Sequence, residues 1–262
     1  MQRTPDGLAY EVAGSGPPVL LLHTGLMDRH SWDPHWEALA RRFTTIRYDG
    51  HAFGDSEDPG ETLCEHADAL AVLDAAGVGR AALVGASYGG LIAVDVALAA
   101  PQRVSALVTV SARPSGWEDD RELIARLEEV ERAYESGGFD AANEVEMRIW
   151  VDGPHRTPDQ VDPDLRAWVA AVNLRVLERQ AVLGPDEEEL QPPAAGRLAE
   201  IRAPTLVITG ALDQASVLAG SRAIAEAVGA DQLEIEGAGH LPNLERPDEF
   251  LAAIVPFLER HA

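Results

Sequence analysis

The sequence predicts an α/β fold with a mostly parallel sheet of about seven to eight strands, covered by helices on both faces. Short aliphatic and β-branched runs alternate along the chain with longer amphipathic stretches, which is typical of parallel strands joined by helices. The length of 262 residues and the hydrophobic share of 46% suit one substantial core. We therefore expect a single sheet domain that carries one insertion.

Strands are expected wherever a short apolar run lies between turn residues. These runs are 8–13, 19–22, 44–48, 81–84, 106–110, 205–209 and 232–235. Helices are expected where apolar residues recur at helical spacing. These stretches are 32–42, 61–76, 88–99, 216–228 and 247–260.

Residues 114–198 break this alternation, because they contain helical patterns punctuated by Gly and Pro and no strand signal. We interpret them as a helical insertion, with 1–113 and 199–262 forming the core domain. The insertion holds Trp117, Trp150 and Trp168. These side chains either pack the insertion onto the sheet or line an apolar pocket, and both readings stay open.

Composition excludes several classes of function. The formal charge of −23 disfavours binding to a phosphate backbone, so no nucleic-acid partner is expected. All 21 basic residues are arginine, which excludes a Schiff-base lysine and a P-loop lysine. Cys64 is the only cysteine, so no intramolecular disulfide and no cysteine zinc site can form. The histidines show no metal-like spacing with carboxylates, and neither a metal site nor a cofactor is expected.

No stretch approaches the roughly 18 unbroken apolar residues of a membrane span, and residues 1–7 resemble no signal-peptide core. We expect a cytoplasmic protein without a membrane partner. The sequence makes no prediction about oligomeric state.

Residues 85–89 read Gly-Ala-Ser-Tyr-Gly and lie between an apolar run and a helical pattern. Ser87 is therefore expected on a sharp strand-to-helix turn, where glycines two residues before and after it let the two arms approach closely. The hydroxyl would stand clear of the sheet, and the Tyr88 N–H at the helix start would face a developing oxyanion.

A serine nucleophile needs a histidine base and an acid that orients it. His240 lies in a glycine-rich loop just after the last expected strand, where its side chain can reach the carboxyl edge of the sheet. Asp213 follows the strand 205–209. The chain order is Ser87, Asp213, His240.

These motifs resemble those of the α/β-hydrolase family, and the resemblance extends over nearly the whole chain. The segment from Leu20-Leu-Leu-His23 to Trp32-Asp-Pro is similar to the family's oxyanion loop. Arg47-Tyr-Asp49 to Ser56 is similar to its second turn. The resemblance implies that Gly25, or one residue on Leu26, supplies the second oxyanion N–H beside Tyr88. Thr24 stands where the family commonly has glycine.

The resemblance also implies a function, namely a serine hydrolase that cleaves a small-molecule carboxylic ester or lactone through an acyl-enzyme. The insertion resembles the family's cap, so Met27, Trp150 and Leu241 are expected to form an apolar substrate pocket. Dehalogenases and epoxide hydrolases of the family need an aspartate where Ser87 stands.

Three alternatives remain open on the same fold. One is a hydrolase of carbon–carbon bonds in diketone-like substrates, which uses the same three residues. Another is a cofactor-free perhydrolase, which the family associates with an oxyanion-loop proline that residues 24–31 lack. The third is a ligand sensor without turnover.

Overall fold

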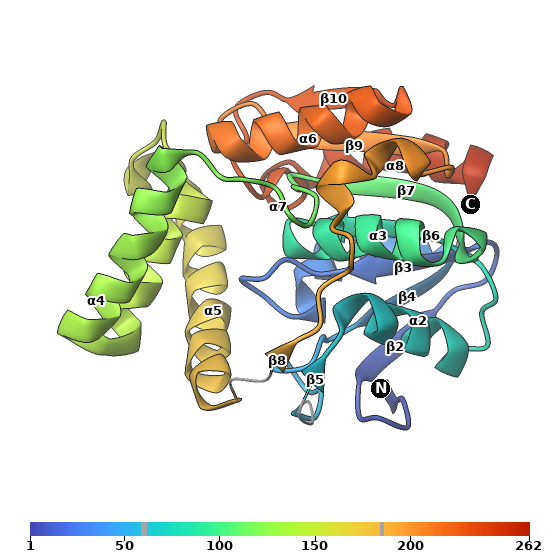
Figure 1. The fold of residues 1–262 in the computed structure, drawn as a ribbon, viewed down its shortest axis with the longest axis horizontal. Helices are drawn as coiled ribbons and strands as arrows, with labels where there is room; N and C mark the ends of the chain where they lie inside the picture. Colours follow the sequence, from blue (N-terminus) through green and yellow to red (C-terminus); the bar gives the residue numbers. More distant parts are fainter. Residues whose placement is uncertain (59–61, 184–185) are drawn as a thin grey trace.

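The computed structural model of the chain describes residues 1–58, 62–183 and 186–262, and it contains an eight-stranded, mostly parallel sheet (Figure 1). The strand order is β1-β2-β4-β3-β6-β7-β9-β10, and only the pairs β1–β2 and β2–β4 are antiparallel. The strands are β1 (Gln2–Arg3), β2 (Ala9–Ala13), β3 (Pro18–Leu22), β4 (Thr44–Tyr48), β6 (Ala81–Ala86), β7 (Val104–Val110), β9 (Thr205–Gly210) and β10 (Asp231–Ile235).

Helices cover both faces of the sheet because successive side chains of each buried strand point to opposite sides. In β3, Leu20 and Leu22 join the core beneath one set of helices, whereas Val19 and Leu21 join the core on the other face. The first set is α2 (Glu65–Ala75), α3 (Tyr88–Ala99) and α6 (Ala215–Val228). The other set is α1 (Asp33–Ala40) and α8 (Pro247–His261).

The predicted fold class is confirmed, and the seven expected strands are all present within a few residues of their expected ends. Sequence reasoning missed the two-residue strand β1 and the short helix α7 (Pro242–Glu245). The helix expected from residue 61 begins at Glu65, and residue 61 itself lies outside the described residues. Short 3₁₀ turns occur at Arg29–Trp32, Pro101–Arg103, Pro158–Gln160, Ala194–Gly196 and Leu198–Glu200.

The segment after β7 is mainly helical. It contains α4 (Arg121–Glu146), a π-helical turn at Met147–Asp152 and α5 (Pro163–Leu183). Figure 1 shows α4 and α5 side by side at one edge of the molecule. The expectation that 114–198 lacks strands is wrong, because β8 (Asp186–Glu187) pairs in parallel with β5 (Thr62–Leu63). Two-residue strands carry no periodic signal that a sequence could reveal.

An apolar cluster joins the helical segment to the sheet domain. Helix α5 contributes Val169, Val172 and Val176 to this cluster. Their partners in the sheet domain include Phe53, which follows β4, and Leu244, which follows β10. A guanidinium adds rigidity within the segment, since Arg166 donates to Asp152 at 2.8 Å and to Glu144 at 3.1 Å. The apolar cluster therefore holds the segment to the sheet domain, and the ion pairs of Arg166 hold the parts of the segment to one another.

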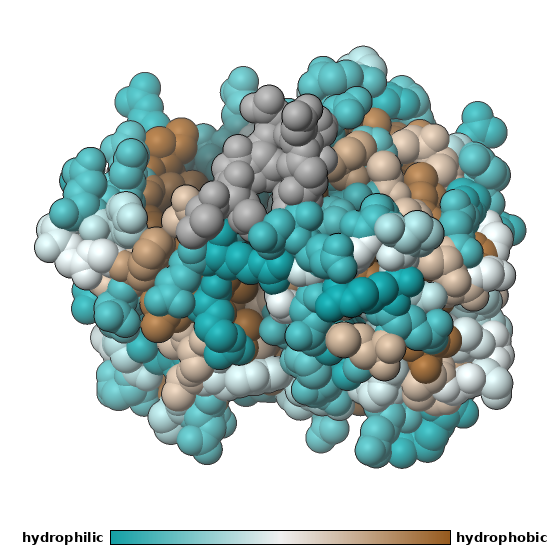
Figure 2. All heavy atoms as spheres, turned by 90° about the horizontal axis from the view of Figure 1, so that it is seen from below, coloured by the Kyte–Doolittle hydropathy of each residue, from teal (hydrophilic) through white to brown (hydrophobic). Residues whose placement is uncertain are grey.

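Most of the face drawn in Figure 2 is hydrophilic, and its apolar side chains gather in several separate groups. Among the described residues, no helix is both long and apolar enough to cross a membrane.

His35 links α1 to the chain just beyond His240. Its Nε2–H donates to the carbonyl oxygen of Asn243 at 3.0 Å, and its ring packs edge-on against Trp32 and Phe250. The side chain is fully buried, and no described residue forms a hydrogen bond with Nδ1. Burial lowers the pKa of His35 to about 4, although the bond to Asn243 favours the charged ring.

Stability is expected to fall as the pH drops through the window between the two pKa values of His35. The unfolded ring has a pKa of about 6.5, so at pH 5 it binds a proton whereas the folded ring stays mostly neutral. The free energy of unfolding of the wild type should therefore fall by about 2 kcal/mol between pH 7 and pH 5 because of this group. His35→Gln keeps a donor for Asn243 and cannot titrate. Urea unfolding of both proteins at pH 7 and pH 5 measures this. The free energy of unfolding should fall by about 2 kcal/mol less in the variant than in the wild type, and an equal fall would show that His35 does not cause the pH dependence.

Candidate active site

Ser87 lies on a strained turn between β6 and α3. Its backbone has φ 53° and ψ −113°, a left-handed conformation that residues with a side chain seldom adopt. Its N–H donates to the carbonyl oxygen of Val110 at 2.7 Å, and its carbonyl accepts from the N–H of Gly90 at 2.9 Å. The turn needs glycine on both sides, because a Cβ on Gly85 would lie 2.1 Å from the carbonyl oxygen of Gly89.

Ser87, His240 and Asp213 form one hydrogen-bonded chain. His240 Nε2 lies 2.8 Å from Ser87 Oγ, and His240 Nδ1 lies 2.9 Å and 3.1 Å from the two carboxylate oxygens of Asp213. Because a carboxylate only accepts, Nδ1 carries the proton and Nε2 is left to accept the serine hydroxyl proton. Asp213 and His240 are buried at 1% and 4% exposure, which shields their hydrogen bond from water.

The loops of the acid and the base contact each other directly. The N–H of Leu212 donates to the carbonyl of Ala238 at 2.9 Å, and the N–H of Gly239 donates to Glu245 Oε1 at 2.8 Å. Glu245 also forms a buried ion pair with Arg156, and Arg156 Nη2 donates to the carbonyl of Val151 at 2.8 Å. The position of His240 is thus tied to the helical segment.

The three residues expected to form the oxyanion site meet at one end of a cavity. Gly25, Leu26 and Tyr88 all line it beside Ser87. The Leu26 N–H makes a long 3.5 Å contact with Thr24 Oγ1, whereas among the described residues no acceptor is found for the Gly25 N–H. His23 fixes this loop, since its Nδ1–H donates to the Thr24 carbonyl at 2.9 Å and its Nε2 accepts from the Gly50 N–H at 3.0 Å.

The cavity above Ser87 has a volume of about 240 Å³ and lies between the sheet domain and the helical segment. Trp150 lines it and packs on His240 with ring centroids 4.6 Å apart. Met27 and Leu241 do not reach it. They are buried at 0% and 1% exposure in the apolar cluster behind its wall, where they pack with α5 instead.

The cavity also has a polar end that sequence reasoning missed. Glu146, on the last turn of α4, and Asn173, on α5, both line it. Asn173 Nδ2 donates to Glu146 Oε2 at 2.5 Å and to Asn143 Oδ1 at 3.0 Å. Burial raises the pKa of Glu146, and the bond from Asn173 opposes that rise. A usable signal was present, because Asn173 interrupts the apolar valine face of α5.

Comparison with known proteins gives one family and relatives of the same length. The chain matches the alpha/beta hydrolase fold family over residues 17–247. A protein of Azorhizobium caulinodans named "Putative carbamate hydrolase RutD" is 32% identical, with 95% of this chain and 94% of that protein covered. The "3-oxoadipate enol-lactonase 1" of Acinetobacter baylyi is 24% identical, with 97% and 94% covered.

A solved hydrolase structure from Pseudomonas aeruginosa is similar along the whole fold. It superposes with a TM-score of 0.78 at 28% identity, covering 98% of this chain and 97% of that one.

Replacing Gly85 by alanine is expected to deform the turn that holds Ser87. The added Cβ would lie within 2.1 Å of a backbone oxygen that cannot move aside, so Gly85→Ala should lower the free energy of unfolding by at least about 2 kcal/mol. Gly79→Ala is the control, because a Cβ there meets open space and should change stability by less than about 0.5 kcal/mol. Urea denaturation of the wild type and both variants measures this. If Gly85→Ala were as stable as Gly79→Ala, the turn would tolerate a side chain at residue 85.

Proposed function

Since the chain belongs to the alpha/beta hydrolase fold family, we propose that it is a serine hydrolase that cleaves small carboxylic esters or lactones. The observation that carries this proposal is the hydrogen-bonded chain from Ser87 through His240 to Asp213, opening into a cavity. A serine hydroxyl is weakly nucleophilic at neutral pH, and a neutral imidazole at hydrogen-bond distance is what activates it.

Catalysis would run in two halves. Ser87 Oγ attacks the carbonyl carbon while His240 Nε2 takes the hydroxyl proton, and the carbonyl oxygen becomes an oxyanion. Collapse of this intermediate breaks the bond to the alcohol, which leaves with the proton from Nε2–H. Water then loses a proton to Nε2 and attacks the acyl carbon, and the bond from this carbon to Ser87 Oγ breaks as Oγ takes the proton back from Nε2–H and the acid leaves. Asp213 stabilises the imidazolium that forms in each half.

Two backbone N–H groups are proposed to hold the oxyanion. One is that of Tyr88 at the start of α3, where the helix dipole favours negative charge. The other is that of Gly25, with Leu26 as the alternative one residue on. The unmatched Gly25 N–H supports this choice, because a donor already engaged in the free protein would have to break a bond first.

The cavity limits which substrates fit. A volume of about 240 Å³ is below the roughly 300–1,000 Å³ of ordinary ligand sites, so acyl groups of a few carbons are favoured. At the polar end, both Asn173 Nδ2 hydrogens are already used, which leaves Asn173 Oδ1 and Glu146 Oε1 as acceptors. A substrate carrying an N–H or O–H donor remote from its carbonyl would satisfy them.

Carbamates are a second candidate substrate class. A relative with 32% identity has carbamate hydrolase in its name, and a carbamate whose nitrogen substituent carries a further N–H or O–H would place that remote donor toward Glu146 and Asn173. The same attack by Ser87 would release an alcohol and leave a carbamoyl-enzyme for water to cleave.

Loss of the serine hydroxyl is expected to abolish turnover. Wild type should hydrolyse p-nitrophenyl acetate and butyrate with saturation and decanoate much more slowly, because the cavity is small. Ser87→Ala should reduce kcat at least about 1,000-fold, and a phosphonate inhibitor should leave one adduct, on Ser87, in the mass spectrum of the wild type. Ser136→Ala, at an exposed helical serine, is the control and should keep full activity.

The outcomes of this experiment separate the rival functions. If Ser87→Ala kept the turnover of the wild type, the proposal would be wrong. A Ser87 adduct without turnover of esters, lactones or carbamates would favour a carbon–carbon hydrolase, to be tried on diketone-like substrates. Neither adduct nor turnover, with stoichiometric ligand binding, would favour a sensor.

Glu146→Leu is expected to change substrate preference rather than the chemical step. Losing a hydrogen bond to a charged group weakens binding by about 10-fold to 100-fold, so kcat/KM should fall by that factor for an ester that carries an amide N–H remote from its ester carbonyl. Turnover of p-nitrophenyl acetate, which has no such donor, should change less than about 3-fold. Glu178→Leu, on the exposed face of α5, provides the matched control. Equal losses for both substrates would refute the role of Glu146.

A further inference from the structure

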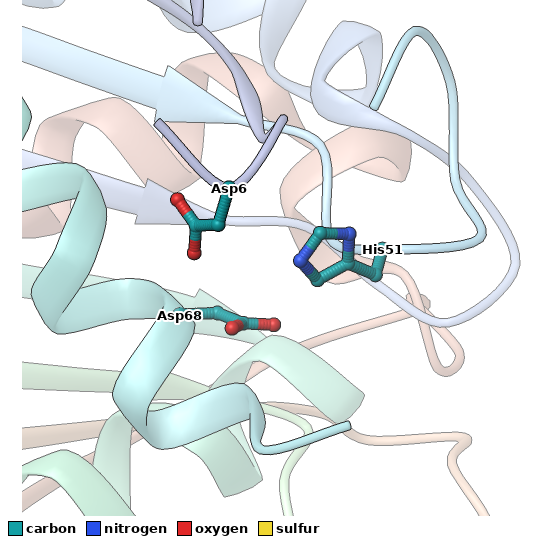
Figure 3. Close-up of side chains that lie close together, drawn as sticks. All are labelled: Asp6, His51 and Asp68. Atoms are coloured by element: carbon teal, nitrogen blue, oxygen red, sulfur yellow. The ribbon is translucent and has the colours of Figure 1, made fainter. Parts of the chain in front are cut away.

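Asp6, His51 and Asp68 gather outside the active-site cavity. They come from the turn between β1 and β2, the loop after β4, and α2. One ligand atom from each, a ring nitrogen or a carboxylate oxygen, lies within 4.8 Å of the other two. Figure 3 shows the His51 ring nitrogen remote from its backbone pointing between the two carboxylates. Their spacing in the sequence contains no metal motif, and only the fold brings them together.

The His51 ring is held as a metal-ligating histidine usually is. The side chain is more than nine-tenths buried, with 7% exposure, and Nδ1–H donates to the carbonyl oxygen of Glu57 at 2.8 Å. This bond places the proton on Nδ1 and leaves the Nε2 lone pair free, since no described residue offers Nε2 a hydrogen bond. Metal-bound histidines typically donate their second nitrogen to a carbonyl or carboxylate in this way.

The carboxylate of Asp68 completes the cluster. Its Oδ2 is buried, and no described group donates a hydrogen bond to it. The carboxylates of Asp6 and Glu65 lie nearby and repel its negative charge. A buried carboxylate oxygen with negative neighbours and no donor is stabilised by a cation.

We propose that Asp6, His51 and Asp68 bind one divalent cation of the first transition row, with zinc the best match. Imidazole suits these ions better than Mg²⁺ or Ca²⁺, which prefer all-oxygen sites. Three protein ligands leave positions for water. Ligand atoms around zinc lie about 3.3 Å apart, as bond lengths of about 2.0 Å require, so the cluster must contract slightly. Asp6 is exposed on a turn and has the freedom to move inward.

A bound cation would join three segments, of which the first two already share hydrogen bonds such as that from the Glu57 N–H to the Gly7 carbonyl at 3.0 Å. Asp6 belongs to the turn closed by Gly7 N–H to Thr4 carbonyl at 3.1 Å, and His51 follows Gly50, whose N–H holds His23. The site would therefore stabilise the loop beneath the oxyanion residues without contacting substrate.

Metal titration of the chelator-treated, tag-free full chain tests the proposal. Calorimetry with Zn²⁺ should give one site in the wild type, and saturating Zn²⁺ should raise Tm by a few degrees. Mn²⁺ should bind more weakly and Mg²⁺ hardly at all. Asp6→Asn and His51→Gln should each weaken Zn²⁺ binding at least about 10-fold and remove most of the Tm rise.

His30→Gln is the matched control, because the His30 side chain is 42% exposed, lies outside the cluster and pairs with Asp33 at 3.2 Å. It should bind Zn²⁺ as the wild type does. Asp6→Asn keeps the test valid if His51→Gln folds poorly, since Asp6 is at the surface. No Zn²⁺ binding by the wild type, or unchanged affinity in Asp6→Asn, would overturn the proposal.

Discussion

The strained backbone at Ser87 is the constraint on which the rest of the site depends. A left-handed residue between a strand and a helix is tolerated only where close backbone packing holds it. Here Gly89 passes so near β3 that a Cβ would lie 2.3 Å from the Leu22 carbonyl oxygen, and Gly90 is equally close to Ala112. The central strands of the sheet therefore fix the position of the Ser87 side chain. The loops that carry Asp213 and His240 have only to bring their side chains within hydrogen-bond distance of it.

Much of this arrangement could be predicted from the sequence because it is encoded locally. Alternating apolar residues in strands such as β3 predict burial on both faces, and glycines around Ser87 predict the turn. Asp213 and His240 follow strands of a parallel sheet, whose carboxyl ends meet at one edge. Their hydrogen bond then follows from topology rather than from any contact that a sequence displays.

What escaped prediction depends on contacts between distant segments. The pairing of β5 with β8 involves two residues on each side, too few for a pattern. Met27 and Leu241 are apolar and near the site in sequence, yet helix α5 covers them and leaves the cavity to Trp150 and polar residues. The path of the helical segment decides this, and its helices could be predicted while their docking could not.

The buried pair Arg156–Glu245 couples the helical segment to the loop that carries His240. Glu245 holds the Gly239 N–H next to His240, and its partner comes from the helical segment. A chimera that receives this segment from a relative without the arginine would leave a carboxylate of 6% side-chain exposure unpaired, beside the proposed general base. Changes of substrate range by segment exchange must therefore preserve this pair.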